Sequence, residues 1–144
     1  MLRYSLMCVM LVLPAFSQNI QVVDQFHEDG MPKVVLHYVD INNKLEMGKK
    51  TYYHPNGQKK KEGTYFNGSK DGTWTEWRDD GTRMEEATYE NGEKHGPWIH
   101  WGKNGKKLKY GEYVRGEKDG VWVKYTPNGI KLWEKFYDHG EEID

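Results

Sequence analysis

The sequence is short of the aliphatic residues that build most protein cores, and it contains a single cysteine. Only 36 % of its 144 residues are apolar, the mean hydropathy is −0.97 and the formal net charge is −1. Length and charge exclude a multi-domain enzyme, a polytopic membrane protein and a strongly basic nucleic-acid binder. Disorder is disfavoured, because 14 % of the residues are aromatic and disordered chains are poor in such residues. We expect one small domain built from turns and aromatic strands.

The first 17 residues differ from the rest and have the pattern of a secretory signal peptide. Arg3 precedes the apolar run 4–14, and Ala15 and Ser17 suit the −3 and −1 positions of a cleavage site before Gln18. The run is shorter than the roughly 20 apolar residues of a membrane-spanning helix, so we expect a protein that does not span the membrane. The alternative is that this run forms a buried first strand or helix.

Cleavage before Gln18 would change the composition of the mature chain. Removing Arg3 from the 21 basic residues leaves 20 against 22 acidic ones, and Cys8 is removed with it. The mature chain could then form neither a disulfide nor a cysteine–metal site. Export without disulfides is more typical of bacteria than of eukaryotic secretion. We therefore expect an exported protein, located in the periplasm, at the cell surface or outside the cell.

Glycines and aromatic residues recur every 24 residues through the rest of the chain, which indicates a repeat architecture. The glycine columns are Gly57, Gly81, Gly105, Gly129; Gly48, Gly72, Gly96, Gly120; and Gly68, Gly92, Gly116, Gly140. The aromatic columns are Trp74, Trp98, Trp122; Tyr53, Trp77, Trp101, Tyr125; and Tyr65, Tyr89, Tyr113, Tyr137. We divide residues 49–144 into four units, 49–72, 73–96, 97–120 and 121–144.

A degenerate copy of the repeat lies upstream, within residues 18–48. Residues 26–30 match residues 53–57 at a spacing of 27, and Tyr38 matches Tyr65 at the same spacing. The three additional residues follow Tyr38 and predict a longer loop there. Terminal units of repeat arrays lack one neighbour and are commonly atypical, so we interpret this segment as an N-terminal cap.

Each unit is predicted to form a β-hairpin. Pro-Asn-Gly or a similar triplet closes one turn, where glycine takes the left-handed conformation, and Asn-Gly closes another. Helix is disfavoured in these units because, from Gly48 onward, glycine interrupts every run of about 12 residues. Stacked hairpins define the expected fold class, all-β, as an elongated single antiparallel sheet of about nine or ten strands, roughly 45 Å long at ~4.8 Å per strand.

The core of this sheet is expected to consist of aromatic rings. Gly63, Ala87 and Gly111 lie two positions before tyrosines, and such small residues leave room for a neighbouring ring to lie flat. Trp74 and Trp77 are three residues apart, so strict alternation places them on opposite faces unless a bulge rotates one ring. We expect most rings to be buried and one tryptophan per unit to stay partly exposed.

Three segments together carry a recognisable pattern: Gly72-Thr73-Trp74-Thr75-Glu76-Trp77, Pro127-Asn128-Gly129, and Tyr89-Glu90-Asn91-Gly92-Glu93-Lys94-His95-Gly96. This pattern resembles the MORN repeat variant family over about residues 49–144, and more weakly over 26–48. The resemblance implies a β-hairpin scaffold that binds proteins or phospholipid head groups. Bacterial members are often labelled YwqK-type antitoxin proteins, which implies a toxin as partner.

No motif in the sequence indicates catalysis, a metal site or a bound cofactor. His95 and His100 lack the i, i+4 spacing of a zinc helix, and the glycines follow the turn period rather than the spacing of a nucleotide-binding loop. Acidic pairs such as Glu85 and Glu86 alternate across a strand instead of facing one cleft. We expect a non-catalytic protein without cofactor or metal.

The candidate binding surface combines rings and basic side chains that recur with the repeat. Regularly spaced rings can stack on sugars or pack against another protein. A basic column beside the first turn could meet an acidic partner or phosphate head groups. The candidate residues are Trp74, Trp77, Trp98, Trp101, Trp122, Tyr125, Lys59, Arg83, Lys107 and Lys131.

These signals have structural alternatives. The rings can form the core, and glutamates near the basic column (Glu62, Glu86 and Glu134) can pair with it to keep a thin sheet soluble. A second basic column, Lys70, Lys94 and Lys118, adjoins a second acidic one, Glu93, Glu117 and Glu141. We expect an exported repeat scaffold that binds another protein, such as an antitoxin-like or immunity-like protein. The alternative is a module that binds envelope glycan or anionic lipid.

Overall fold

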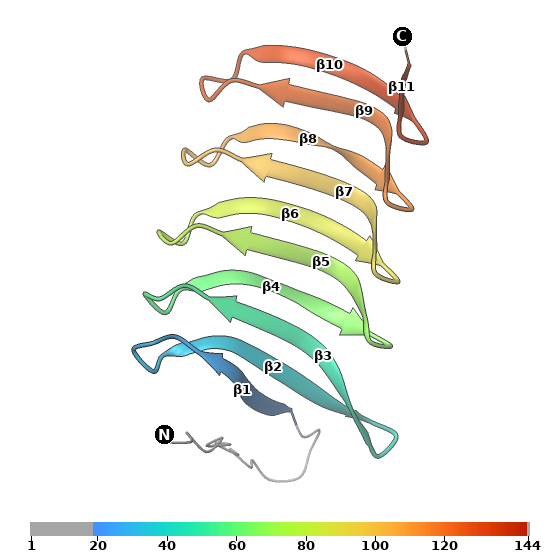
Figure 1. The fold of residues 1–144 in the computed structure, drawn as a ribbon. Coiled ribbons are helices and arrows are strands. Elements are labelled where there is room, and N and C mark those ends of the chain that lie inside the picture. The colour runs from blue at the N-terminus through green and yellow to red at the C-terminus, as the bar shows by residue number, and fades with distance from the viewer. Residues whose placement is uncertain (1–18, 144) are drawn as a thin grey trace.

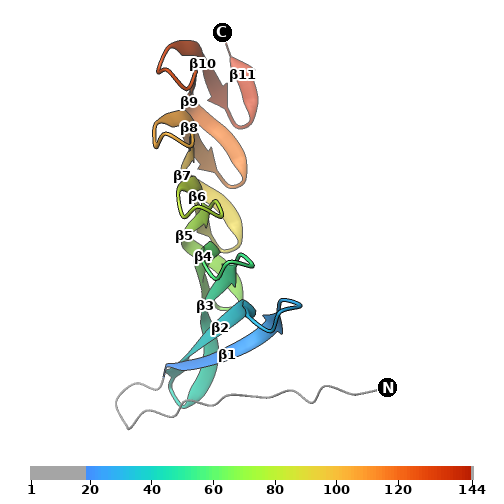
Figure 2. The same cartoon turned by 90° about the vertical axis from the view of Figure 1, so that its left-hand side faces the viewer.

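The computed structural model describes residues 19–143, which form one open antiparallel sheet whose eleven strands lie side by side in sequence order. The strands are β1 (Ile20–Phe26), β2 (Pro32–Ile41), β3 (Lys44–Tyr53), β4 (Lys59–Phe66), β5 (Ser69–Trp77), β6 (Arg83–Glu90), β7 (Glu93–Trp101), β8 (Lys107–Val114), β9 (Glu117–Tyr125), β10 (Lys131–Asp138) and β11 (Glu141–Ile143). β1 and β11 lie at opposite ends of an elongated, twisted ribbon (Figures 1 and 2). The predicted signal peptide lies outside the described residues.

The predicted fold class is confirmed, because the described chain is a single antiparallel sheet of stacked hairpins. Eleven strands are present rather than nine or ten, since β1 and the three-residue β11 extend the two ends of the sheet. Each strand pairs only with its neighbours in sequence. Each hairpin is therefore stabilised by contacts with the hairpins next to it in sequence, as in other repeat proteins.

Two kinds of turn alternate along the sheet and explain two of the three glycine columns. In the turn after β5, the Gly81 N–H donates to the Arg78 carbonyl at 3.0 Å, and Gly81 has a φ of +81°. In the turn after β6, both Asn91 and Gly92 have positive φ, +51° and +92°. Two such residues form a type I′ turn, whose twist matches that of the flanking strands.

The N-terminal hairpin differs from the sequence prediction. The three additional residues do not form a longer loop; instead β2 and β3 are ten residues each and are joined by Asn42 and Asn43. Both asparagines have positive φ, +56° and +63°, and so make a tight two-residue turn. The predicted longer loop is wrong because this turn lets the additional residues pair between the strands.

The core is thin and its largest side chains are tryptophans lying over glycine. Trp74 and Trp122 are 2 % and 1 % exposed. A Cβ built on Gly63 would lie 2.1 Å from the Trp74 ring, and one on Gly111 would lie 2.3 Å from the Trp122 ring. The rings therefore occupy the space that side chains would otherwise fill, which confirms the predicted role of Gly63 and Gly111.

The two faces of the sheet carry different side chains. Lys61 lies over the Trp74 ring, whereas the next residue, Glu62, pairs with Lys59, which lies over the Trp77 ring. Trp74 and Trp77 are therefore on opposite faces, as strict alternation predicts. We call the face with Trp74, Trp98, Trp122 and the tyrosines Tyr65, Tyr89, Tyr113 and Tyr137 the aromatic face. We call the other, with Thr51, Glu62, Glu86 and Glu134, the ion-pair face.

Candidate functional site

The predicted basic column lies on the ion-pair face and is largely neutralised there. Three of its four members bond to a glutamate three residues later: Lys59 to Glu62 at 2.9 Å, Arg83 to Glu86 at 3.1 Å and Lys131 to Glu134 at 3.0 Å. Lys107 is the exception, because Tyr110 stands where the other units have glutamate, and its Nζ lies 5.6 Å from that ring centroid. The ion-pair alternative is confirmed for this column.

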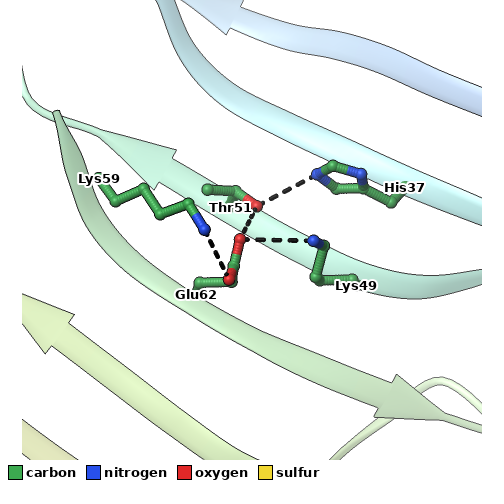
Figure 3. A network of polar contacts seen from close by, with 5 residues as sticks. All are labelled: His37, Lys49, Thr51, Lys59 and Glu62. Atoms are coloured by element: carbon green, nitrogen blue, oxygen red, sulfur yellow. Dashed lines mark hydrogen bonds and ion pairs between the residues drawn. The ribbon is translucent and has the colours of Figure 1, made fainter. Parts of the chain in front are cut away.

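A polar network on the same face is satisfied from within (Figure 3). The Thr51 hydroxyl, which is fully buried, donates to Glu62 at 2.9 Å and lies 3.2 Å from the His37 Nε2. Burial alone would raise the pKa of Glu62, but hydrogen bonds from Lys59 and Thr51 and the charge of Lys49 hold it below its usual value. Burial, and then Lys49, lowers the pKa of His37. This network is therefore structural.

The second basic column, Lys70, Lys94 and Lys118, lies over rings of the aromatic face. Lys70 Nζ lies 4.4 Å from the Trp74 ring centroid, and Lys118 Nζ lies 4.5 Å from that of Tyr137. Within residues 19–143 none of the three forms an ion pair, so the expected pairing with Glu93, Glu117 and Glu141 is wrong. Attraction to the electron-rich ring faces takes its place.

The structure separates the predicted aromatic residues into core and surface. Trp74, Trp101 and Trp122 are 9 % exposed or less, so their rings offer little area to a partner, and their assignment to a binding surface is corrected. Trp77, Trp98 and Tyr125 are half-buried. Together with the half-buried Trp133, this leaves one partly exposed tryptophan in each of the last three units, as predicted.

Trp98 differs from its two counterparts on the aromatic face. The indole N–H groups of Trp74 and Trp122 donate to backbone carbonyls ten residues earlier, each at 3.1 Å. The Trp98 Nε1 is buried and has no hydrogen-bond partner. Its ring instead stacks on those of Trp122 and His100, with centroids 5.4 and 6.2 Å apart.

Ala87 accounts for this difference. On the strand that precedes it, Trp98 lies opposite Ala87, whereas the rings of Trp74 and Trp122 cover glycines of their preceding strands, Gly63 and Gly111. Since a Cβ on either glycine would lie within 2.3 Å of the ring above it, the Trp98 ring cannot lie over Ala87 in the same way. The sequence shows Ala87 breaking the glycine pattern, but the loss of the indole hydrogen bond is visible only in the structure.

Two hollows open on the aromatic face. The first, of about 670 Å³, is lined by Tyr52, Trp74, Lys61 and Glu76 among others, and Lys61 forms an ion pair with Glu76. Burial alone would lower the pKa of Lys61, but its hydrogen bond to Glu76 and the charge of Glu76 together raise it above its ordinary value. The second hollow, of about 510 Å³, contains two lysines and no carboxylate.

Metal ligands gather at one place in the described residues. Ligand atoms of Asp119, Asp138 and His139 lie within 4.8 Å of one another beside the turn between β10 and β11. Asp138 and His139 are exposed, and their mutual hydrogen bond raises the pKa of His139. Exposed acidic groups of this kind are common without an ion. No helix that could cross a membrane is found between residues 19 and 143.

Comparison with known proteins supports the repeat class. Residues 48–67 and 70–91 match the MORN repeat variant family, which confirms the resemblance seen in the sequence. Two consecutive segments of the chain are therefore similar to MORN repeat variants. No curated protein matches the sequence. A crystal structure of the GtfA/B complex bound to UDP and GlcNAc is similar to 89 % of this chain at 10 % identity and a TM-score of 0.35, over 26 % of that chain.

Proposed function

We propose that the protein is a non-catalytic scaffold that binds another protein on its aromatic face. The observation that carries this proposal is the contrast between the faces. Glutamates neutralise most of the cations on the ion-pair face, whereas Lys70, Lys94 and Lys118 rest on rings without a carboxylate partner in the described chain. Tryptophan and tyrosine rings are common energetic centres of protein interfaces, and unpaired cations beside them favour an acidic partner.

The test is affinity capture with the two faces altered separately. The mature chain is used as bait on periplasmic and surface fractions, beside a Lys70→Glu/Lys94→Glu variant and a Lys107→Glu control. Lys107 lies on the opposite face and forms no ion pair within residues 19–143. We expect one captured protein to be lost with the double variant and kept with the control. Loss with the control alone, or capture unaffected by either change, would contradict the proposal.

Export is part of the proposal and has its own test. It rests on residues 1–17, whose pattern is that of a signal peptide. We expect the protein recovered from the periplasm, surface or medium to begin at Gln18, as determined by intact mass. A full-length chain confined to the cytoplasm would contradict it. An antitoxin-like role fits the proposal if the captured partner is a toxin whose activity the scaffold blocks.

Binding to envelope glycan or anionic lipid is a second candidate, favoured by the same lysines over the same rings. Co-sedimentation with phosphatidylglycerol vesicles and with cell-wall polysaccharide tests it. If this candidate is right, the wild-type chain co-sediments with the vesicles or the polysaccharide, and the Lys70→Glu/Lys94→Glu variant does not. The affinity capture described above then recovers no protein partner. Absence of co-sedimentation by the wild-type chain excludes it.

A further inference from the structure

The second hollow lies where the charge pattern of the repeat fails. Equivalent cross-strand pairs in successive units are Lys61 with Glu76, Glu85 with His100, and Lys109 with Lys124. Opposite charges facing each other across strands stabilise a sheet, and like charges destabilise it. Only the third pair places two lysines opposite one another, and no carboxylate among residues 19–143 bonds to either.

Lys109 is held at this place by rings rather than by an anion. Its Nζ lies 5.7, 5.4 and 5.4 Å from the ring centroids of Trp98, Trp122 and Trp133. Burial, followed by the charges of Lys118 and Lys124, lowers its pKa. A cation among other cations in a partly desolvated place gains strongly from a bound carboxylate, since charge-assisted hydrogen bonds are about twice as strong as neutral ones.

The hollow offers an apolar wall as well. It is lined by Trp98, His100, Lys109, Lys124, Tyr125 and Leu132 among others. The Trp98 Nε1 is buried without a hydrogen-bond partner, which makes its N–H signal a reporter of changes at this ring. Leu132 is 53 % exposed. Apolar walls with a few convergent polar groups are the usual composition of a binding pocket.

We infer that this hollow binds a carboxylate side chain of an acidic segment in the partner protein. The carboxylate bonds to Lys109 and Lys124, and an apolar residue beside it packs against Leu132 and the Trp98 ring. The inference rests on the proposed function and adds to it the position and chemistry of the contact. It also distinguishes the second hollow from the first, where Glu76 of the chain itself already supplies the carboxylate.

The test uses two blocked pentapeptides, one of alternating leucine and glutamate and one with glutamine in place of glutamate. Binding to the mature chain is followed by titration of the tryptophan indole N–H signals, with the Trp98 signal assigned from a Trp98→Phe variant. We expect the glutamate peptide to bind at least tenfold more tightly than the glutamine peptide and to shift the Trp98 signal. Equal binding of the two peptides overturns the inference.

Variants locate the contact. Lys124→Gln changes an exposed side chain and leaves the rings in place, so it tests the site even where Lys109→Gln alters the packing. We expect each of these two variants to bind the glutamate peptide about tenfold more weakly than the wild-type chain does. The control Lys107→Gln, on the other face of β8, should bind it as the wild-type chain does. Unchanged binding by Lys124→Gln overturns the inference.

The failure of this inference can be told from failure of the scaffold proposal. If Lys124→Gln still captures the protein that the wild-type chain captures, the inferred carboxylate contact is wrong, whereas the proposal of a protein-binding scaffold is still supported. If phosphatidylglycerol vesicles bind through the same lysines while neither peptide does, the hollow recognises lipid phosphate, and the assignment to a protein carboxylate is overturned.

Discussion

The aromatic face and the ion-pair face share the same strands but are stabilised by different chemistry. On the aromatic face, rings occupy the space above glycine, and a change of one methyl group decides whether a ring lies flat. On the ion-pair face, glutamates pair with partly exposed cations, so replacement of a glutamate leaves its cations solvated. Steric fit should therefore tolerate substitution less than charge pairing does, and four changes test this difference.

The largest expected effect is that of a methyl group beneath a buried ring. Gly111→Ala puts a Cβ 2.3 Å from the Trp122 ring, so we expect the free energy of unfolding to fall by about 3 kcal/mol, as overpacking of a core does. Chemical denaturation followed by tryptophan fluorescence measures this loss.

Gly116→Ala is the control for this change. Unlike Gly111, Gly116 has a positive φ, +84°, but nothing lies within 4 Å of an added Cβ. We expect this variant to lower the free energy of unfolding by only about 1 kcal/mol, because alanine is less stable than glycine in the left-handed conformation. Equal losses for the two variants would show that the ring above Gly111 is free to move, against the packing described.

The second effect is that of the carboxylate at the centre of the ion-pair network. Glu62→Ala leaves the buried Thr51 hydroxyl without its acceptor, so we expect a loss of about 1–2 kcal/mol at pH 7. Denaturation at a series of pH values measures it, with the wild-type chain as reference.

The loss should depend on pH in a defined direction. The pKa of Glu62 is lower in the folded chain than its ordinary value of about 4.3, so the unfolded chain binds the proton first. The stabilisation is complete above pH ~4.3 and disappears as the pH falls through the lower folded-state pKa. Wild-type and variant curves that stay parallel down to pH 2 would show that the charge of Glu62 contributes nothing.

The third effect concerns Trp98. Ala87→Gly removes the Cβ that keeps this ring from lying flat, and we expect the indole N–H to gain the carbonyl partner that its two counterparts have. The free energy of unfolding should change by less than about 1 kcal/mol, because the new hydrogen bond offsets the cost of glycine in a strand. Slower solvent exchange of the Trp98 indole proton checks this, and an unchanged rate would contradict it.

The fold could be predicted from the sequence because period and turn chemistry are local. Glycine or asparagine at most left-handed turn positions indicates where strands begin and end, and the 24-residue period indicates which strands pair. The predicted loop after Tyr38 was wrong because only the pairing partner shows whether additional residues lengthen strands or a loop.

The site was less predictable because alternation does not reveal which rings are covered. Trp74, Trp98 and Trp122 share one column, yet only Trp98 has alanine in place of glycine on its preceding strand, and its indole N–H has no partner. The facing lysines 109 and 124 are fifteen residues apart in sequence, and only the strand register brings them together. The ion pairs of the first basic column could be predicted because both partners lie on one strand, three residues apart.

The smallest expected effect is that of an exposed ion pair. Arg83→Gln removes a bond to Glu86, but the Arg83 side chain is 59 % exposed and solvent screens the pair, so we expect a loss of about 0.5 kcal/mol or less. The difference from wild type should vanish in 1 M salt, where the Debye length is about 3 Å. A loss as large as that of Glu62→Ala, persisting in salt, would mean that Arg83 acts through packing on the Trp101 ring, whose centroid lies 5.5 Å from its guanidinium carbon. The ion-pair face would then depend on steric fit as much as the aromatic face does.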